Sequence, residues 1–227
     1  DWCPKLTCAC SIIVRQKALN YAVGDFYSYT NSGFALLPTI VERISGMPFA
    51  RFSTERIFRP LGMTNTRWRD DFTTIVPRRA QAYSRRADGW HLDMPFEQVH
   101  GPGGLLTTVG DWLKWNDALD KRSLGAVSDS LLSRATLTNG RSIPYAMGLN
   151  NRTYRGTIEW AHSGSTAGYR TYLVRYPKQA LSIAVMCNAA GAVPTSYARE
   201  LADALIPDLS PPATFDTVAA DPNRISR

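Results

Sequence analysis

The residue pattern changes at Asn139-Gly140, and this change limits the folds that the chain can adopt. Before this point apolar residues recur at the helical period, most clearly at Leu37, Ile40, Val41 and Ile44. Gly46 follows them at the position of a helix C-cap. Beyond it, short segments rich in β-branched and aromatic residues alternate with turns. Helices followed by strands predict an α+β fold, mainly helical over residues 15–140 and built on an antiparallel sheet over 141–207.

Further helices are predicted where a start signal precedes apolar residues at helical spacing. Pro48 suits the first turn of a helix that ends before Pro60. Thr108 and Asp111 begin another helix, which continues to Leu119. The side chains that this helix is expected to bury are Val109, Trp112 and Leu113. A weaker helical pattern covers residues 128–137.

The strand predictions rest on β-branched and aromatic segments bounded by turns. Residues 79–84 and 90–94 flank Ala87-Asp88-Gly89 and predict a hairpin. Four sheet strands are predicted at residues 145–150, 158–162, 169–176 and 181–188. A closing helix follows over residues 194–206 and is expected to pack through Tyr197, Leu201, Ala204 and Leu205. Residues 1–14 show no clear periodicity, and the proline- and aspartate-rich residues 208–227 are expected to form a loose tail.

The composition is typical of a globular chain that can bury a substantial core, with 44% hydrophobic and 20% charged residues among 227. No apolar run reaches the roughly 18 residues that a bilayer requires, so a transmembrane helix is not expected. The chain begins at Asp1 and shows no charged segment followed by an apolar one, the pattern of a secretory signal. The sequence therefore leaves the compartment open.

Neither the charge nor the cysteines point to a macromolecular partner or a cofactor. The formal charge of +7 could favour nucleic acid, but the densest basic group brackets the predicted hairpin: Arg78, Arg79, Arg85 and Arg86. A solvated basic face is the simpler interpretation, and no nucleic-acid partner is predicted. Three cysteines are crowded near the N-terminus without a histidine beside them, Cys3, Cys8 and Cys10. We expect unpaired or oxidised thiols there, with no metal site and no cofactor.

Two short stretches carry residues suited to acyl-transfer chemistry. Tyr29-Thr30-Asn31 precedes the first helix, and His162-Ser163-Gly164 stands at the end of an apolar strand. Taken alone, each fits a plain structural role: a buried tyrosine, an N-capping asparagine and a strand-end histidine satisfied by its neighbours.

The surroundings of these stretches resemble a known family. The segments are residues 27–37, 40–46, 57–63, 101–108 and 160–170. In order and spacing they resemble β-lactamase-like serine hydrolases, the penicillin-recognising group of class C β-lactamases, D-amino-acid peptidases and related esterases. The resemblance runs from about Arg15 to Ile206. It implies a domain over residues 15–207 in which a helical lobe and a sheet lobe meet at a cleft.

The resemblance also implies roles for individual residues. In this family a serine attacks the acyl carbonyl and a lysine one turn later shares its proton. Tyr29 would act as general base or proton shuttle, and Asn31 would hydrogen-bond the substrate amide or the lysine. His162 would replace the family's second lysine and polarise the site or donate to the intermediate. The cleft would be lined by Ser163, Gly164 and Ser165, the last giving its backbone amide to an oxyanion hole.

The sequence departs from the family because it contains no Ser-x-x-Lys motif. The residues three positions before its five lysines are Trp2, Val14, Asp111, Ala118 and Arg175. No Gly-x-Ser-x-Gly, Walker or His-Glu-x-x-His motif replaces it. The simplest interpretation is a truncated or frame-shifted serine hydrolase that lacks its N-terminal strands and nucleophile helix. Its family hydrolyses esters, amides or β-lactams. Without the nucleophile, this chain is expected to be inactive. The alternatives are an inert ligand-binding or interaction protein and a structural fragment without a function of its own.

The family resemblance finally predicts an exposed sheet edge. In the family the N-terminal strands pair beside the last strand, here residues 181–188. Without them this apolar strand would present an open edge, a template for pairing with another chain. The predicted partners are therefore a small acyl substrate and, through this edge, a second copy of the chain.

Overall fold

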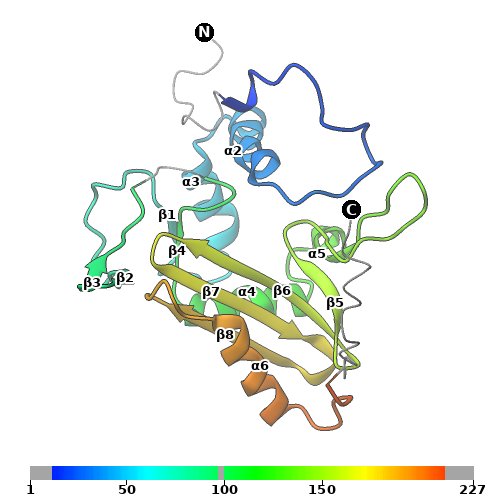
Figure 1. Cartoon of the computed structure of the whole chain (residues 1–227). Helices are drawn as coiled ribbons and strands as arrows, with labels where there is room; N and C mark the ends of the chain where they lie inside the picture. Colours follow the sequence, from blue (N-terminus) through cyan, green and yellow to red (C-terminus); the bar gives the residue numbers. More distant parts are fainter. Residues whose placement is uncertain (1–11, 97–99, 213–227) are drawn as a thin grey trace, which may run out of the picture.

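The computed structural model describes residues 12–96 and 100–212. The crowded cysteines, most of the irregular N-terminal stretch and most of the C-terminal tail lie outside these residues. The chain order begins with α2 (Asn31–Ser45), α3 (Phe49–Ser53) and a π-helical turn η1 (Thr54–Phe58), and passes through short strands to α4 (Val109–Asp120) and α5 (Ala126–Leu132). It continues with strands β5 to β8 and a final helix, so the α+β fold is confirmed (Figure 1).

The main sheet is antiparallel and has the order β5-β6-β7-β8. Its strands are β5 (Asn150–Tyr154), β6 (Thr157–Thr166), β7 (Tyr169–Tyr176) and β8 (Leu181–Cys187). The bounds predicted for β7 are confirmed. The strand predicted at residues 145–150 is wrong, because Gly148 turns the chain with φ +91° and Tyr145 makes only one isolated bridge, to Asn150.

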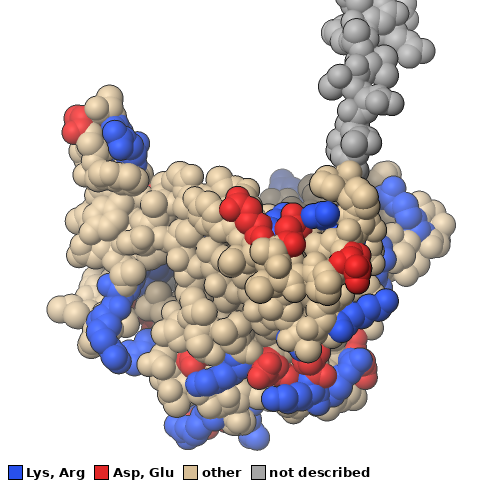
Figure 2. Space-filling view, turned by 90° about the horizontal axis from the view of Figure 1, so that it is seen from below, with Lys and Arg blue, Asp and Glu red and all other residues tan. Residues whose placement is uncertain are grey.

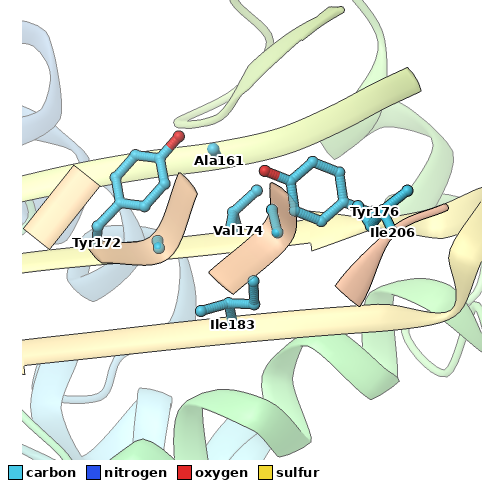
Figure 3. Packing of buried hydrophobic residues seen from close by; sticks show 8 residues of the cluster. Ala161, Tyr172, Val174, Tyr176, Ile183 and Ile206 are labelled. Atoms are coloured by element: carbon cyan, nitrogen blue, oxygen red, sulfur yellow. The ribbon is translucent and has the colours of Figure 1, made fainter. Parts of the chain in front are cut away.

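The hydrophobic core lies between this sheet and α6 (Pro194–Leu205) (Figure 3). Alternate residues of the strands point to the same face, and the strands contribute Ala161, Tyr172, Val174, Tyr176 and Ile183. Helix α6 meets them with two small residues one turn apart, Ala198 and Ala202, both fully buried. The prediction that Leu201 and Leu205 would pack inward is wrong, since Leu201 is 48% exposed. The large tyrosine side chains of the sheet fill the space between the sheet and α6. The helix can therefore approach the sheet only with small side chains such as alanine.

Helix α4 lies against the opposite face of the sheet from α6 (Figure 1). Its predicted start is confirmed, because Thr108 Oγ1 accepts a hydrogen bond from the Asp111 amide at 3.2 Å. The face that it buries is partly polar: the Asn116 amide group donates to the Ser182 hydroxyl at 3.2 Å. The prediction that Val109 is buried is wrong, since it is 41% exposed. Buried polar partners, which apolar spacing cannot reveal, set the orientation of this helix.

The remaining helices differ from the predictions mainly in what they bury. Helix α2 ends as predicted at Gly46, which adopts the left-handed conformation with φ +67°. Its apolar stripe nevertheless faces solvent, and Ile44 is 83% exposed. Helix α5 is shorter than predicted and stops at Leu132, because Ser133 is extended. Each of these helices was therefore located by its pattern, whereas its packing was not.

Two small sheets and one open edge complete the fold. The predicted hairpin is confirmed as β2 (Tyr83–Arg86) and β3 (Gly89–Leu92), although β2 begins four residues later than predicted. A second pair joins β1 (Arg67–Trp68) to β4 (Leu105–Leu106). Within the described ranges, β8 pairs along its length only with β7, so its outer edge is open. In the same part of the chain, no helix is both long enough and apolar enough to cross a membrane.

Candidate active site

The first part of the candidate site is the segment that enters α2. Thr30, not Asn31, is the N-cap, since its Oγ1 accepts from the Ser32 amide at 3.1 Å. Asn31 begins the helix and is exposed, and its side chain has no hydrogen-bond partner among the described residues. Tyr29 is 55% exposed rather than buried. The plain structural roles considered for this tyrosine and this asparagine are therefore wrong, and both side chains are available to a ligand.

The second part is the free end of β6. Pairing with β5 stops at Asn150 and Ala161, whereas β6 continues to Thr166 along β7 alone. From His162 onward, one backbone edge of β6 therefore has no strand partner among the described residues. Because Ala161 faces α6, the alternation of the strand turns His162 to the other face, toward the helical lobe.

The two parts meet through an aromatic cluster that includes a residue not anticipated from the sequence. The Tyr29 and His162 rings lie 6.1 Å apart between centroids. Tyr145 contacts both rings, and its hydroxyl lies 3.1 Å from His162 Nε2. Its ring packs against Tyr27, Tyr29 and His162 at centroid distances of 5.7, 5.8 and 6.0 Å. Tyr145 lies in a loop without a motif, so no signal in the sequence points to it.

Burial shifts the pKa of two tyrosines in this cluster. Burial, reinforced by the neighbouring Tyr29 and Tyr27 hydroxyls, raises the pKa of Tyr145 to about 12. Burial, followed by the proximity of Tyr29, also raises the pKa of Tyr27. Tyr145 is therefore a neutral phenol at physiological pH and can donate a hydrogen bond.

The residues that follow His162 point alternately to the two faces of the sheet. Gly164 lies on the same face as His162, and a Cβ atom there would come within 2.4 Å of Thr171 Oγ1 on β7. The side chains of Ser163 and Ser165 project to the opposite face of the pleat and are exposed. The Ser163 carbonyl oxygen lies 2.6 Å from His162 Nδ1. Only backbone atoms of these two serines can therefore act on the His162 side.

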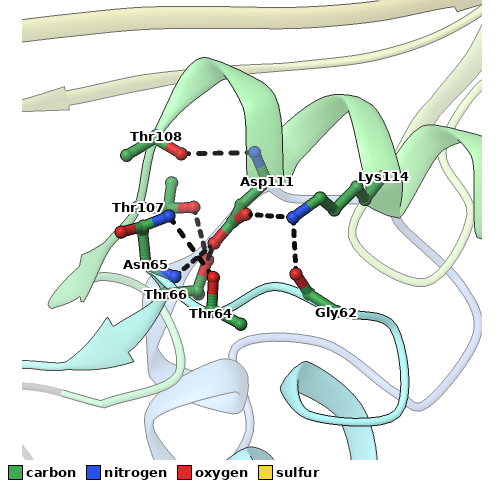
Figure 4. A network of polar contacts seen from close by, with 8 residues as sticks. All are labelled: Gly62, Thr64, Asn65, Thr66, Thr107, Thr108, Asp111 and Lys114. Atoms are coloured by element: carbon green, nitrogen blue, oxygen red, sulfur yellow. Dashed lines mark hydrogen bonds and ion pairs between the residues drawn. The ribbon is translucent and has the colours of Figure 1, made fainter.

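Two contacts hold the helical lobe around the site. Gly101, with φ +93°, lies so close to α2 that a Cβ atom would stand 2.1 Å from the Phe34 carbonyl oxygen. The buried Asp111 carboxylate accepts from the Asn65 amide at 2.7 Å, the Thr66 hydroxyl at 2.9 Å and Lys114 Nζ at 2.9 Å (Figure 4). The first contact packs the loop that contains Gly101 against α2. The second links α4 to the segment just before β1.

A hollow lies elsewhere, between η1 and β1. It encloses about 570 Å³ and is lined in part by Arg51, Arg59, Arg67 and Trp68. It includes none of the candidate site residues. Acidic and basic side chains are interspersed along the rim of the face drawn in Figure 2. Among residues 12–96 and 100–212, no group of three His, Cys, Asp or Glu side chains is arranged to hold a metal ion.

The comparisons with known proteins agree with this architecture. A D-aminopeptidase of Gluconobacter oxydans is 27% identical over 199 residues, which cover 86% of this chain and 37% of the relative. Penicillin-binding protein 4* of Bacillus subtilis is 31% identical over 172 residues, covering 66% of this chain and 37% of the relative. The structure of an octameric penicillin-binding protein homologue from Pyrococcus abyssi matches with a TM-score of 0.68 and 26% identity, over 80% of this chain and 43% of that one.

The helical lobe, the antiparallel sheet with its packed helix and these structural matches define the fold class of the penicillin-recognising proteins. The family described as Beta-lactamase matches residues 12–206, and the chain belongs to this family. The chain spans little more than a third of the length of the curated relatives that it matches, 37% for the two above.

Proposed function

We propose that this chain carries the tyrosine–histidine side of a serine hydrolase cleft that acts on an acyl substrate. The observation that carries the proposal is the meeting of Tyr29 and His162, from different lobes, at 6.1 Å between ring centroids. The D-aminopeptidase relatives favour an amide of a D-amino acid over an ester or a β-lactam as that substrate. The functional domain is proposed to run over residues 15–207.

The proposed roles follow from the exposure of each group. Tyr29 is accessible and would move the proton of the attacking hydroxyl, while Asn31 offers an unpaired amide to the substrate. The free backbone edge of β6 would place the Ser165 amide as an oxyanion donor. Gly164 allows β6 to pack closely against β7 at this point, since a Cβ atom there would contact Thr171. His162 would support the site from the floor of the cleft.

The nucleophile is proposed to come from residues other than these 227. A serine and a lysine must be three positions apart on a helix to share one face, and no such pair exists in the sequence. Reaction with an active-serine probe tests this. We expect the chain alone to keep its unmodified mass after incubation with a fluorophosphonate.

An inert ligand-binding protein is the second candidate, and the missing Ser-x-x-Lys motif is the observation that favours it. The two candidates differ in what a nucleophile segment adds. A hydrolase would become acylated when a polypeptide bearing that motif completes the cleft. A binding protein would hold the same ligand without ever forming the acyl bond.

Self-association is expected from the surface beside the sheet. The outer edge of β8 has no strand partner within the described ranges, and α6 exposes Tyr197, Leu201 and Leu205 next to it. An open edge flanked by apolar side chains favours pairing with a second copy. We predict a dimer or larger species by light scattering at tens of micromolar. Replacing the exposed Leu201 of α6 with glutamate would reduce it, and a monodisperse wild-type monomer would refute this expectation.

A further inference from the structure

The loop between α5 and β5 brings a buried phenol against the site histidine. The Tyr145 side chain is held on both sides: it belongs to a buried cluster with Leu137 and Ile143, against which Phe34 of α2 packs. Its carbonyl oxygen accepts from the Ala135 amide at 3.1 Å. The position of its hydroxyl is therefore fixed by the fold and not by a flexible surface chain.

The contacts of His162 determine which of its nitrogens carries the proton. Nδ1 lies 2.6 Å from the Ser163 carbonyl oxygen, which can only accept, so Nδ1 donates. In the neutral imidazole Nε2 is then the acceptor. Its neighbour at 3.1 Å is the Tyr145 hydroxyl, which remains protonated and donates to it.

We propose that Tyr145 is a positioning residue that holds His162 in the Nδ1-protonated tautomer, with Nε2 as a hydrogen-bond acceptor. This inference rests on the proposed function, because it defines how the site histidine works. Both nitrogens are occupied, so the neutral His162 has no N–H to offer an intermediate. The hydrogen bond between Tyr145 and His162 holds the histidine beside Tyr29, whose ring lies 5.8 Å from that of Tyr145.

The test is the tautomer of His162, read from long-range proton–nitrogen NMR spectra of the ¹⁵N-labelled chain. The sequence has three histidines, so a His162→Asn spectrum assigns the signals. In spectra recorded at alkaline pH, we expect a protonated Nδ1 and an unprotonated, hydrogen-bonded Nε2. In Tyr145→Phe, the Nε2 signal should move to the position of a free acceptor, and the population of the Nε2-protonated tautomer should rise.

Tyr27→Phe is the matched control, because Tyr27 packs on Tyr145 but has no hydrogen-bond partner among the described residues. It should leave the His162 signals unchanged. An Nε2-protonated His162 in the wild type would overturn the proposal whether or not the phenylalanine variant folds. So would an unchanged His162 spectrum in a folded Tyr145→Phe chain. These readouts do not depend on activity, so their failure is distinct from failure of the acylation test.

Discussion

Replacing Gly101 with alanine is expected to destabilise the chain by about 3 kcal/mol or more, counting both backbone strain and overpacking. The residue adopts φ +93°, which side chains other than hydrogen rarely allow. The added Cβ would also meet the Phe34 carbonyl oxygen at 2.1 Å and its carbon at 2.9 Å. These atoms belong to the backbone of α2, so no side-chain rotation relieves the contact. Urea unfolding would measure the loss.

Gly103→Ala is the matched control for this experiment. Gly103 lies in the same glycine-rich loop, but a Cβ atom added there would meet nothing within 4 Å, and its φ is not positive. We expect a change within about 0.5 kcal/mol, as for most substitutions that disturb no packed contact. Equal stabilities of the two variants would contradict the close approach of this loop to α2. Because α2 begins directly after Thr30, Gly101→Ala should also shift the resonances of Tyr29.

Asp111→Asn is expected to cost about 2–4 kcal/mol, because it leaves Lys114 and two other donors around a group that no longer accepts them all. The carboxylate is almost fully buried, whereas Lys114 is half exposed, which limits the loss. The control is Asp117→Asn on the same helix. Asp117 forms an exposed pair with Lys121 at 3.5 Å, worth at most about 1 kcal/mol.

The stability due to Asp111 should also depend on pH. Burial opposes the charged form, but hydrogen bonds from Lys114, the Asn65 amide and Thr66 outweigh it and hold the pKa of Asp111 below its ordinary value. A lowered folded-state pKa gives stability that is fully present above the unfolded value, about 3.9, and is lost as the pH falls through the folded value. The difference between wild type and Asp111→Asn should therefore shrink below about pH 4. A difference that stays constant down to about pH 2 would contradict this network.

Element positions were largely predictable from the sequence, whereas the packed faces were not. Capping signals at Thr108 and Gly46 are local, so they located the start of α4 and the end of α2 correctly. Apolar spacing misjudged α6, because Tyr197 and Leu201 face solvent while alanines face the sheet. The spacing of apolar residues shows that they share one face of a helix. It does not show whether that face packs against the rest of the protein.

The candidate site was predictable only where it follows sequence motifs. Tyr29, Asn31 and His162 belong to such motifs, and the fold brings the tyrosine and the histidine together. Tyr145 was missed because its contact with His162 depends on the loop before β5, whose turn was mistaken for a strand. Contacts of this kind arise from tertiary packing and leave no local pattern.

The central claim, that these residues form one side of a serine hydrolase cleft without its nucleophile, is tested most directly by intact mass. The purified chain would be incubated with a fluorophosphonate and, separately, with benzylpenicillin, and its mass recorded beside a Tyr29→Phe control. The account predicts the unmodified mass in every case. A stoichiometric adduct on the wild-type chain, mapped to one serine, would contradict it and identify a nucleophile within these 227 residues.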